Sequence, residues 1–490
     1  MNNKKNAISS LFFQLTTIVQ GLVLPRLILV AFGSETNGLV SSAAQVLSFI
    51  SLLEGGLGAV VLAELYKPVE EKDDEKIQSI LNACQSFFSI LTVLFLVYTL
   101  LAAFIYPRFV NTNFSDEYIS LLILILSMTT AAQYLFSITY RLLLQAEQKL
   151  YIVNCISAFT VLLNTISSVL IVCVFPSVHM VKLWSGIIYL VQPLAYRAFV
   201  EKKFLRSGTG RSNSRYALKN RWSGFAQNLA HFVNMNTDVV VITIFMPLQY
   251  VSVYSVHLLV INALRGIISS VGNSYQSALG KYIAVGNCSQ LKANFARFER
   301  AFWLVGMIVF FCCTLLIDPF VQIYTAGIDD AAYYQPAFSF ILVLANMFYV
   351  FREPYRLLVL AGGKFKETNF GAVAESVLNL VLSLLLVGRF GLAGVAAGTL
   401  IAISFRLCSL IWYLRRDFLK RSYTSLFPYI ATFFLLLLTN LAVYTQWPLK
   451  LGGIFHFLLA GCVVFGAESV LCILVYWTVR KIFEPTRRKQ

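Results

Sequence analysis

The sequence predicts an all-α polytopic membrane protein: about fourteen transmembrane helices, arranged as two six-helix lobes and two extra C-terminal helices. Three observations support this fold class. The 490 residues are 58% hydrophobic and only 13% charged, whereas soluble domains are about a quarter charged. Apolar segments of about 20 residues, the length that crosses a bilayer, recur along the whole chain. Finally, part of the first half of the sequence repeats in the second half.

The apolar segments define the expected spans in order. The first follows a basic start, but it is too long and too polar for a cleaved signal peptide, so we take it as an uncleaved span. The expected spans are 7–31, 38–63, 80–106, 118–140, 150–174, 182–200, 222–245, 250–275, 300–324, 335–360, 367–388, 391–414, 424–445 and 452–479.

The basic residues predict the orientation of these spans. If the N-terminus is cytoplasmic, 31 of the 39 Lys and Arg residues fall in cytoplasmic segments or helix ends, among them Arg352 and Arg415. Only 4 fall in segments on the outer side of the membrane, and the other 4 lie within spans. Such an asymmetry is the positive-inside signal. Both termini are therefore expected in the cytoplasm, and the net charge of +16 reflects topology rather than nucleic-acid binding.

The internal repeat predicts two lobes. Residues 140–172 align without gaps on residues 355–387, an offset of 215, with 12 identities in 33 positions that include Tyr140/Tyr355 and Asn164/Asn379. Six spans separate the copies, so both lobes have one orientation, as in a parallel repeat. We expect an N-lobe with spans 1–6, a C-lobe with spans 7–12, and a last pair of spans with a cytoplasmic tail. Their ranges are 1–205, 206–422 and 423–490.

The seventh expected span carries one polar face. Gln227, His231, Asn234 and Asp238 recur at i, i+4, i+7 and i+11, which places them on one side of a helix. Polar groups facing hydrocarbon are costly, so this face either lines a solvated passage or belongs to a buried hydrogen-bond network between helices. The carboxylate of Asp238 favours the passage, with a role in ion or proton coupling.

The eighth span has a similar face around Asn262 and Arg265. Arg265 is expected beyond mid-membrane, where its guanidinium can hold a phosphate. The alternative is a purely structural ion pair between Arg265 and Glu54 of span two. Glu54 is also a candidate for ion coupling. Gln14 and Arg26 of span one complete the expected polar lining, although Arg26 has an alternative position at the interface.

Other intramembrane groups are expected to be structural. Glu375 and Arg406 lie at similar depths on consecutive antiparallel spans and are predicted to pair. Glu468 has no identifiable partner in the sequence, and His257 is expected at the membrane interface. Gly394 and Gly398 form a GxxxG pattern that is typical of close helix packing.

Several motifs are not found in the sequence. It has no phosphate-binding loop, no Cys or His pattern of metal-ligand spacing, and no pair of cysteines in outside loops. Few loop carboxylates remain for hydrolytic chemistry. We therefore expect no enzyme, no metal and no cofactor.

Ordered motifs resemble the multidrug/oligosaccharidyl-lipid/polysaccharide flippase superfamily, and within it the Wzx-type polysaccharide flippases. They are Leu24-Pro25-Arg26 with the following Gly33 to Gly38 segment, Ser51 to Ala59 followed by Leu65 to Pro68, Tyr140 to Lys149, and the Asp238 helix with Tyr254. The resemblance covers essentially the whole chain. The cavity arginines of MurJ-like proteins do not map onto this sequence.

This resemblance implies MATE- and MurJ-like lobes that alternate access to a central cavity in a bacterial cytoplasmic membrane. The implied substrate is an undecaprenyl-diphosphate-linked oligosaccharide, moved from the inner to the outer leaflet for capsule, exopolysaccharide or O-antigen assembly. The implied partners are this lipid, membrane lipids and polysaccharide assembly proteins, and coupling is to a proton, a sodium ion or the membrane potential. A MurJ-like lipid II flippase, a cation-coupled MATE drug exporter and a membrane-embedded polymerase or acyltransferase remain alternatives.

Overall fold

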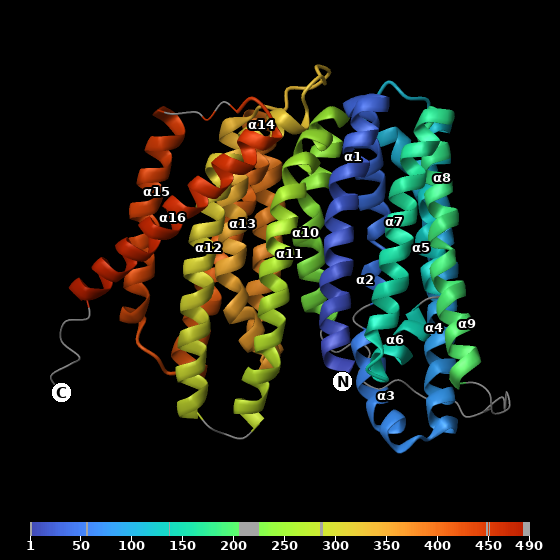
Figure 1. Cartoon of the computed structure of the whole chain (residues 1–490), viewed down its shortest axis with the longest axis horizontal. Coiled ribbons are helices and arrows are strands. Elements are labelled where there is room, and N and C mark those ends of the chain that lie inside the picture. The colour runs from blue at the N-terminus through green and yellow to red at the C-terminus, as the bar shows by residue number, and fades with distance from the viewer. Residues whose placement is uncertain are drawn as a thin grey trace. The chain divides into compact units, whose positions relative to one another are not determined.

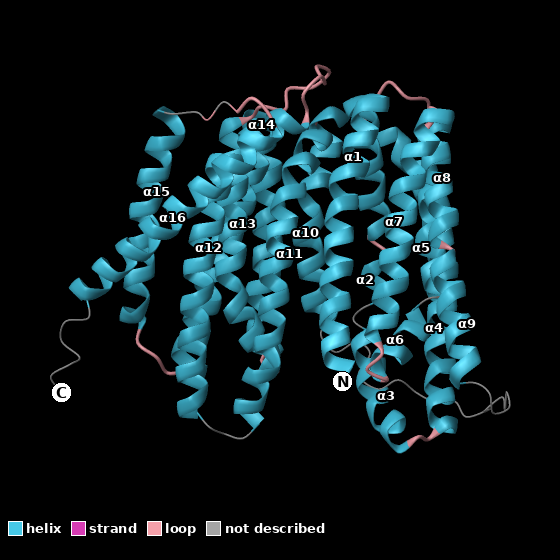
Figure 2. Ribbon diagram, in the orientation of Figure 1, coloured by secondary structure: helices cyan, strands magenta, loops and turns pink. Residues whose placement is uncertain are grey.

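A computed structural model of the chain describes residues 2–54, 57–136, 138–204, 225–284, 288–446, 449 and 451–483. Within these ranges all regular structure is helical (Figure 2). The predicted all-α membrane fold is confirmed.

The helices of the first half differ in length and in continuity. Several expected spans consist of two consecutive helices rather than one. The helices are α1 (Asn2–Ser48), α2 (Ser51–Glu54), α3 (Leu57–Glu71), α4 (Asp74–Ile105), α5 (Asp116–Phe136), α6 (Ile138–Ala146), α7 (Leu150–Val174), α8 (Val178–Tyr189) and α9 (Val191–Phe204).

The helices of the second half are longer. They are α10 (Phe225–Phe245), α11 (Leu248–Ala284), α12 (Cys288–Tyr324), α13 (Pro336–Ala361), α14 (Phe365–Tyr413), α15 (Phe427–Gln446) and α16 (Ile454–Phe483). A π-helical segment, η2 (Leu414–Phe418), extends α14.

The chain divides into two compact units. The first unit comprises residues 1–232 and 246–252, and the second comprises residues 233–245 and 253–490. In the first unit α1 packs on α7, and α5 packs on α4 and α8. In the second unit α13 packs on both α12 and α14, while α15 and α16 pack on α12 and on each other (Figure 1).

Ten helices in the described ranges are long and apolar enough to cross a membrane. Two of them, Ile8–Ser48 and Glu367–Phe418, have 41 and 52 residues, enough to cross a hydrocarbon core of about 30 Å twice. Each of these two helices covers two of the fourteen expected spans, or parts of them. Two other expected spans do not appear among the ten helices. Span 182–200 is broken between α8 and α9, and only the C-terminal part of span 222–245 is strongly apolar.

Glycines mark the turn inside each of the two longest helices. Gly33 in α1 has φ 81° and Gly391 in α14 has φ 55°. A residue with a Cβ rarely adopts such angles, so glycine permits the chain to leave one helix and begin the next. These turns lie where the sequence predicts spans one and two, and spans eleven and twelve, to separate.

The two arms of α14 pack closely at the predicted GxxxG pattern. A Cβ on Gly394 would lie 2.4 Å from the Leu386 carbonyl oxygen, and one on Gly398 would lie 2.8 Å from the Ser383 nitrogen. Neither distance is compatible with a real side chain. The interpretation of this motif as a close-packing surface is therefore confirmed.

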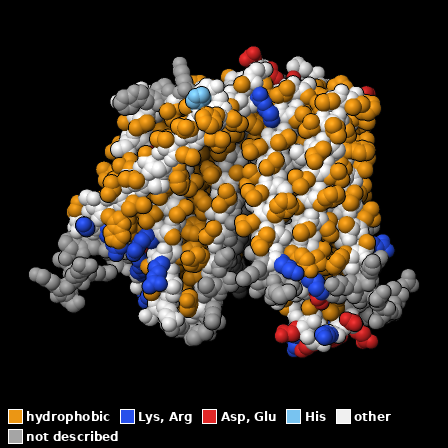
Figure 3. All heavy atoms as spheres, viewed as in Figure 1, with side chains coloured by type: hydrophobic (Ala, Val, Ile, Leu, Met, Phe, Trp, Pro, Cys, Tyr) orange, Lys and Arg blue, Asp and Glu red, His pale blue; other side chains and the backbone are white. Residues whose placement is uncertain are grey.

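The outer surfaces of the helices are apolar. On the face shown in Figure 3, hydrophobic side chains cover most of the helices, and the charged side chains in view lie mainly near helix ends. His257, which the sequence predicts at the membrane interface, is fully buried in the protein; Val253 O accepts from its Nδ1 at 2.8 Å, and Ser339 Oγ lies 3.0 Å from its Nε2.

Candidate functional site

Asp238 lies in the interior of the second unit. Its side chain is 4% exposed. Tyr254 of α11 donates to Asp238 Oδ2 at 2.7 Å, and Thr399 Oγ1 of α14 lies 2.9 Å from both carboxylate oxygens. Two hydroxyl groups therefore hold the carboxylate in place without a Lys or Arg partner among the described residues.

A series of hydrogen bonds leads away from Asp238. Thr399 Oγ1 lies 3.2 Å from Asn379 Oδ1, and Asn379 Nδ2 donates to Asn234 Oδ1 at 2.9 Å. Asn234 Nδ2 in turn donates to Glu375 Oε1 at 2.7 Å. We call Tyr254, Asp238, Thr399, Asn379, Asn234 and Glu375 the polar chain.

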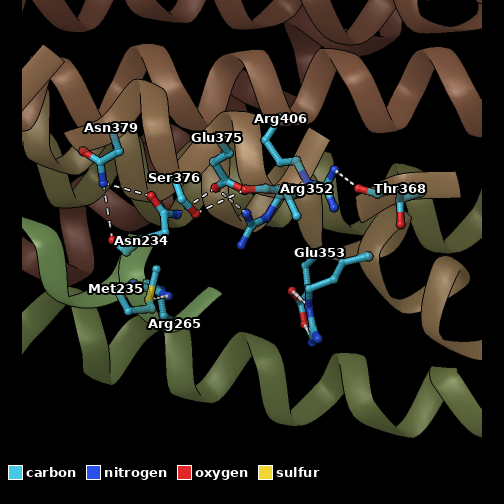
Figure 4. Close-up of polar contacts among 12 residues, drawn as sticks. Asn234, Met235, Arg265, Arg352, Glu353, Thr368, Glu375, Ser376, Asn379 and Arg406 are labelled. Carbon is cyan, nitrogen blue, oxygen red and sulfur yellow. Dashed lines mark hydrogen bonds and ion pairs between the residues drawn. The ribbon is translucent and has the colours of Figure 1, made fainter. Parts of the chain in front are cut away.

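Glu375 ends the polar chain in an ion cluster. Arg352 of α13 donates to Glu375 Oε1 at 2.7 Å, and Arg406 Nε lies 3.6 Å from Glu375 Oε2 (Figure 4). Arg406 also donates to the Thr368 carbonyl oxygen at 2.8 Å. The three charged side chains are at most 6% exposed, so each depends on the others to offset the cost of leaving water.

The predicted pairing of Glu375 with Arg406 is confirmed, but its shorter bond is with Arg352. Arg352, counted among the basic residues of cytoplasmic segments and helix ends, has a side chain that is only 4% exposed inside the second unit. Arg415, also assigned to such an end, is fully buried and bonded to Glu299 at 2.6 Å. At both positions the positive charge is paired with a buried carboxylate.

Arg265 stacks on an aromatic ring beside this cluster. Its guanidinium lies 3.7 Å from the centroid of Tyr349, and Arg352 lies 4.3 Å from the same ring. Arg265 also donates to Asn346 Oδ1 at 3.1 Å, and its NH2 nitrogen lies 3.6 Å from Met235 Sδ. A cation held by a ring face and an amide keeps its charge available to an anion.

The structure thus brings three predicted site residues into the second unit: Asn234 and Asp238 are buried, and Arg265 is half-buried. Asn262, on the same helix as Arg265, is exposed. Gln14 and Arg26 are both half-buried on α1 of the first unit. The side chains of Gln227, His231 and Glu54 lie outside what the structure describes.

Of the two interpretations of the span-seven face, the hydrogen-bond network between helices is present at Asn234 and Asp238. Sequence reasoning missed Thr399 and Asn379 as their partners. The repeat contained a signal for Asn379, because it aligns with Asn164, and their i+4 neighbours Ser383 and Ser168 also align. In the structure each serine contacts its asparagine, Ser383 Oγ at 3.1 Å and Ser168 Oγ at 3.4 Å.

The fold matches solved transport proteins. The lipid II flippase MurJ in an inward closed conformation aligns with a TM-score of 0.66 and 14% identity, covering 99% of each chain. An inward-facing MATE family multidrug transporter aligns at 0.66 and 15%, covering 84% of this chain and 96% of its own. A eukaryotic MATE transporter aligns at 0.60 and 14%, covering 94% and 99%.

Comparisons of sequence alone give a different result. No protein-family model matches the chain, and no curated protein matches it. The structural likeness, at 14–15% identity, is therefore a likeness of fold. The chain has the fold that MurJ and the MATE transporters share.

Proposed function

We propose that this protein is a membrane flippase that moves an undecaprenyl-diphosphate-linked oligosaccharide from the inner to the outer leaflet by alternating access. The product would serve capsule, exopolysaccharide or O-antigen assembly in a bacterial cytoplasmic membrane. Both termini would be cytoplasmic, and polysaccharide assembly proteins would be partners. The shared fold supports a transporter of this kind, and the chemistry of Arg265 supports an anionic substrate.

Arg265 is the observation on which the proposal depends. It lies on a predicted membrane-spanning helix, and no carboxylate pairs with it among the described residues. Its neighbours are the Tyr349 ring, the Asn346 amide and the Met235 sulfur, none of which neutralises the charge. A cation in this setting favours an anionic ligand, and the planar guanidinium suits the oxygens of a diphosphate.

The surroundings of Asp238 support a role in ion or proton coupling rather than in binding the substrate. It is buried, and Tyr254 and Thr399 already contact its carboxylate, so a bulky cationic drug has little access to it. A proton or a sodium ion is small enough to use the same oxygens, with the Asn379 amide oxygen nearby. This argues against the drug-exporter alternative, and coupling to a small cation at Asp238 is part of the proposal.

Lipid II is the second candidate substrate. The MurJ structure covers 99% of both chains, so the match includes nearly all of α15 and α16 as well as both repeats. Lipid II and the proposed oligosaccharide lipid share a polyprenyl diphosphate and differ in the sugar. The same site chemistry fits either, and only a transport assay separates them.

The test uses the full chain in proteoliposomes that contain a lipid-linked oligosaccharide with a labelled sugar, or labelled lipid II in a parallel sample. We expect the parent protein to expose the sugar on the opposite leaflet, and Arg265→Gln to slow this about tenfold or more, since a hydrogen bond to a charged group contributes about 1.5–3 kcal/mol. Arg416→Gln, at an exposed arginine, is the control. Unchanged transport by Arg265→Gln contradicts the anion site, and transport of lipid II alone selects the second candidate.

A further inference from the structure

The ring of Tyr349 on α13 contacts two arginines of the second unit. Its centroid lies 3.7 Å from the guanidinium of Arg265 on α11 and 4.3 Å from the guanidinium of Arg352, which is on α13 itself. A ring face attracts a cation, but two like charges so close together also repel each other. The arrangement therefore needs a group that offsets one of the two charges.

Glu375 of α14 offsets the charge of Arg352 and leaves that of Arg265. Its Oε1 accepts from Arg352 at 2.7 Å, and the two side chains are only 4% and 5% exposed (Figure 4). Arg265 is half-buried and has no carboxylate partner among the residues that the structure describes. Tyr349 thus contacts one arginine that is paired and one that keeps its charge for a ligand.

Arg265 also keeps hydrogen-bond donors for a ligand. A guanidinium has five N–H groups. One on NH1 donates to Asn346 Oδ1 at 3.1 Å, and one on NH2 points to Met235 Sδ at 3.6 Å. The remaining N–H groups have no partner in the described part of the chain. Two of them are enough for bidentate contact with the oxygens of a phosphate.

Helix α13 carries all the groups that connect Arg265 to the buried ion pair. Asn346, Tyr349 and Arg352 follow one another three positions apart, which places them on one side of the helix. Asn346 is fixed from its own helix, because its Nδ2 donates to the Leu342 carbonyl oxygen at 2.8 Å. The amide and the ring that contact Arg265 therefore belong to the same rigid element as the arginine that binds Glu375.

From this geometry we propose that Tyr349 is a positioning residue, through which the buried Arg352–Glu375 pair keeps Arg265 oriented for bidentate binding of a diphosphate. The ring face fixes the plane of the Arg265 guanidinium, and Asn346 fixes one of its nitrogens. Arg352, which Glu375 holds, supports the ring. This inference rests on the proposed function, because it takes Arg265 as the site for the anionic part of the substrate.

Binding of farnesyl diphosphate to the purified full chain in detergent tests the proposal, with farnesol as the uncharged reference. We expect Arg265→Gln to bind the diphosphate about tenfold more weakly or worse, because it loses charged hydrogen bonds. Tyr349→Leu should bind it about threefold to tenfold more weakly, the usual size of a cation–ring contact. Tyr349→Phe keeps the ring and should restore the affinity of the parent protein.

Arg352→Lys tests the connection to the ion pair. The lysine keeps a positive charge for Glu375, but its compact ammonium does not stack on a ring as a guanidinium does. We expect diphosphate binding to weaken about twofold to threefold, a part of the cation–ring effect. This variant also tests the ring contact if Tyr349→Leu does not fold.

Phe348→Leu is the matched control, because it removes a neighbouring ring of the same helix. Phe348 packs on Phe351 and Phe433, with ring centroids 5.8 Å and 5.4 Å away. Its loss should lower the unfolding temperature and leave the affinity for farnesyl diphosphate unchanged. A loss of affinity in this variant equal to that of Tyr349→Leu would show that general packing, and not positioning of Arg265, explains the effect.

Three further results overturn the proposal, and they differ in what else they remove. Parent-like binding by Tyr349→Leu, while Arg265→Gln binds weakly, removes the positioning role but keeps the anion site. Parent-like binding by Arg352→Lys shows that the ring acts without the ion pair. No difference between the parent protein and Arg265→Gln removes the anion site, and the proposed function fails with it.

Discussion

Asn234 donates its side-chain amide to Glu375 Oε1 at 2.7 Å and joins two parts of the second unit that differ in chemistry. On one side, Asn379 links Asn234 to the carboxylate of Asp238 through Thr399. On the other side, Glu375 is paired with arginines. Thr399 has one hydroxyl hydrogen, which it donates either to Asp238 or to the Asn379 oxygen. A change of charge at Asp238 can therefore alter which of the two Thr399 bonds, and Asn234 connects Asn379 to the cluster of opposite charges.

Replacing Asn234 tests this linkage. Asn234→Leu leaves the Asn379 amide with only the backbone oxygen of residue 234, 3.3 Å away, as an acceptor and removes one donor from Glu375, so we expect a loss of about 1–3 kcal/mol in stability and weaker dependence of transport on an ion gradient. Thermal unfolding in detergent and transport with and without the gradient measure the two effects. Asn82→Leu, at an exposed position on α4, should change neither, and full gradient dependence in Asn234→Leu would rule out the route.

Neutralising Glu375 should destabilise the second unit strongly. Glu375→Gln leaves Arg352 and Arg406 buried without their carboxylate, and removal of one partner of a buried ion pair costs about 3–5 kcal/mol. Glu367→Gln on the same helix removes an exposed pair with Lys364 and should cost about 1 kcal/mol or less. Chemical or thermal unfolding of the two variants gives the comparison, and equal losses would show that the cluster contributes no more than a surface pair.

The sequence predicted the helical membrane fold and the Glu375–Arg406 pair because hydrophobic length and helix order determine both. It did not reveal the burial of Arg352, since the sequence near the end of α13 does not show that Glu375 of α14 pairs with it. It gave no partner for Glu468, although Asn440 Nδ2 of α15 donates to Glu468 Oε1 of α16 at 3.2 Å, because the two residues lie on separate helices and no periodicity relates them. The polar face of span seven was recognised, whereas its partners on α11 and α14 depend on packing that a one-dimensional pattern does not contain.

Asp238→Asn should separate coupling from folding. The amide oxygen of asparagine still accepts from Tyr254 or Thr399, so the fold is expected to persist, but the neutral side chain no longer binds a proton or attracts a cation. We expect transport driven by an ion gradient to fall about tenfold or more, within the usual range of coupling between sites, while gradient-free exchange continues. Asp417→Asn, at an exposed residue, is the matched control. Retained gradient-driven transport in Asp238→Asn would assign coupling elsewhere.

The close contact between the two arms of α14 predicts opposite effects for two glycines of that helix. Gly394→Ala places a methyl group 2.4 Å from the Leu386 carbonyl oxygen, and because backbone cannot move aside as a flexible side chain does, we expect a loss of about 1–3 kcal/mol. A Cβ on Gly388 meets no atom within 4 Å, so Gly388→Ala should be neutral or gain up to about 1 kcal/mol from helix propensity. Thermal unfolding of both variants measures the difference. If Gly394→Ala and Gly388→Ala were equally stable, the two arms of α14 would have to separate readily. The close packing of the arms would then not be needed to hold Thr399 against Asn379 and Asp238.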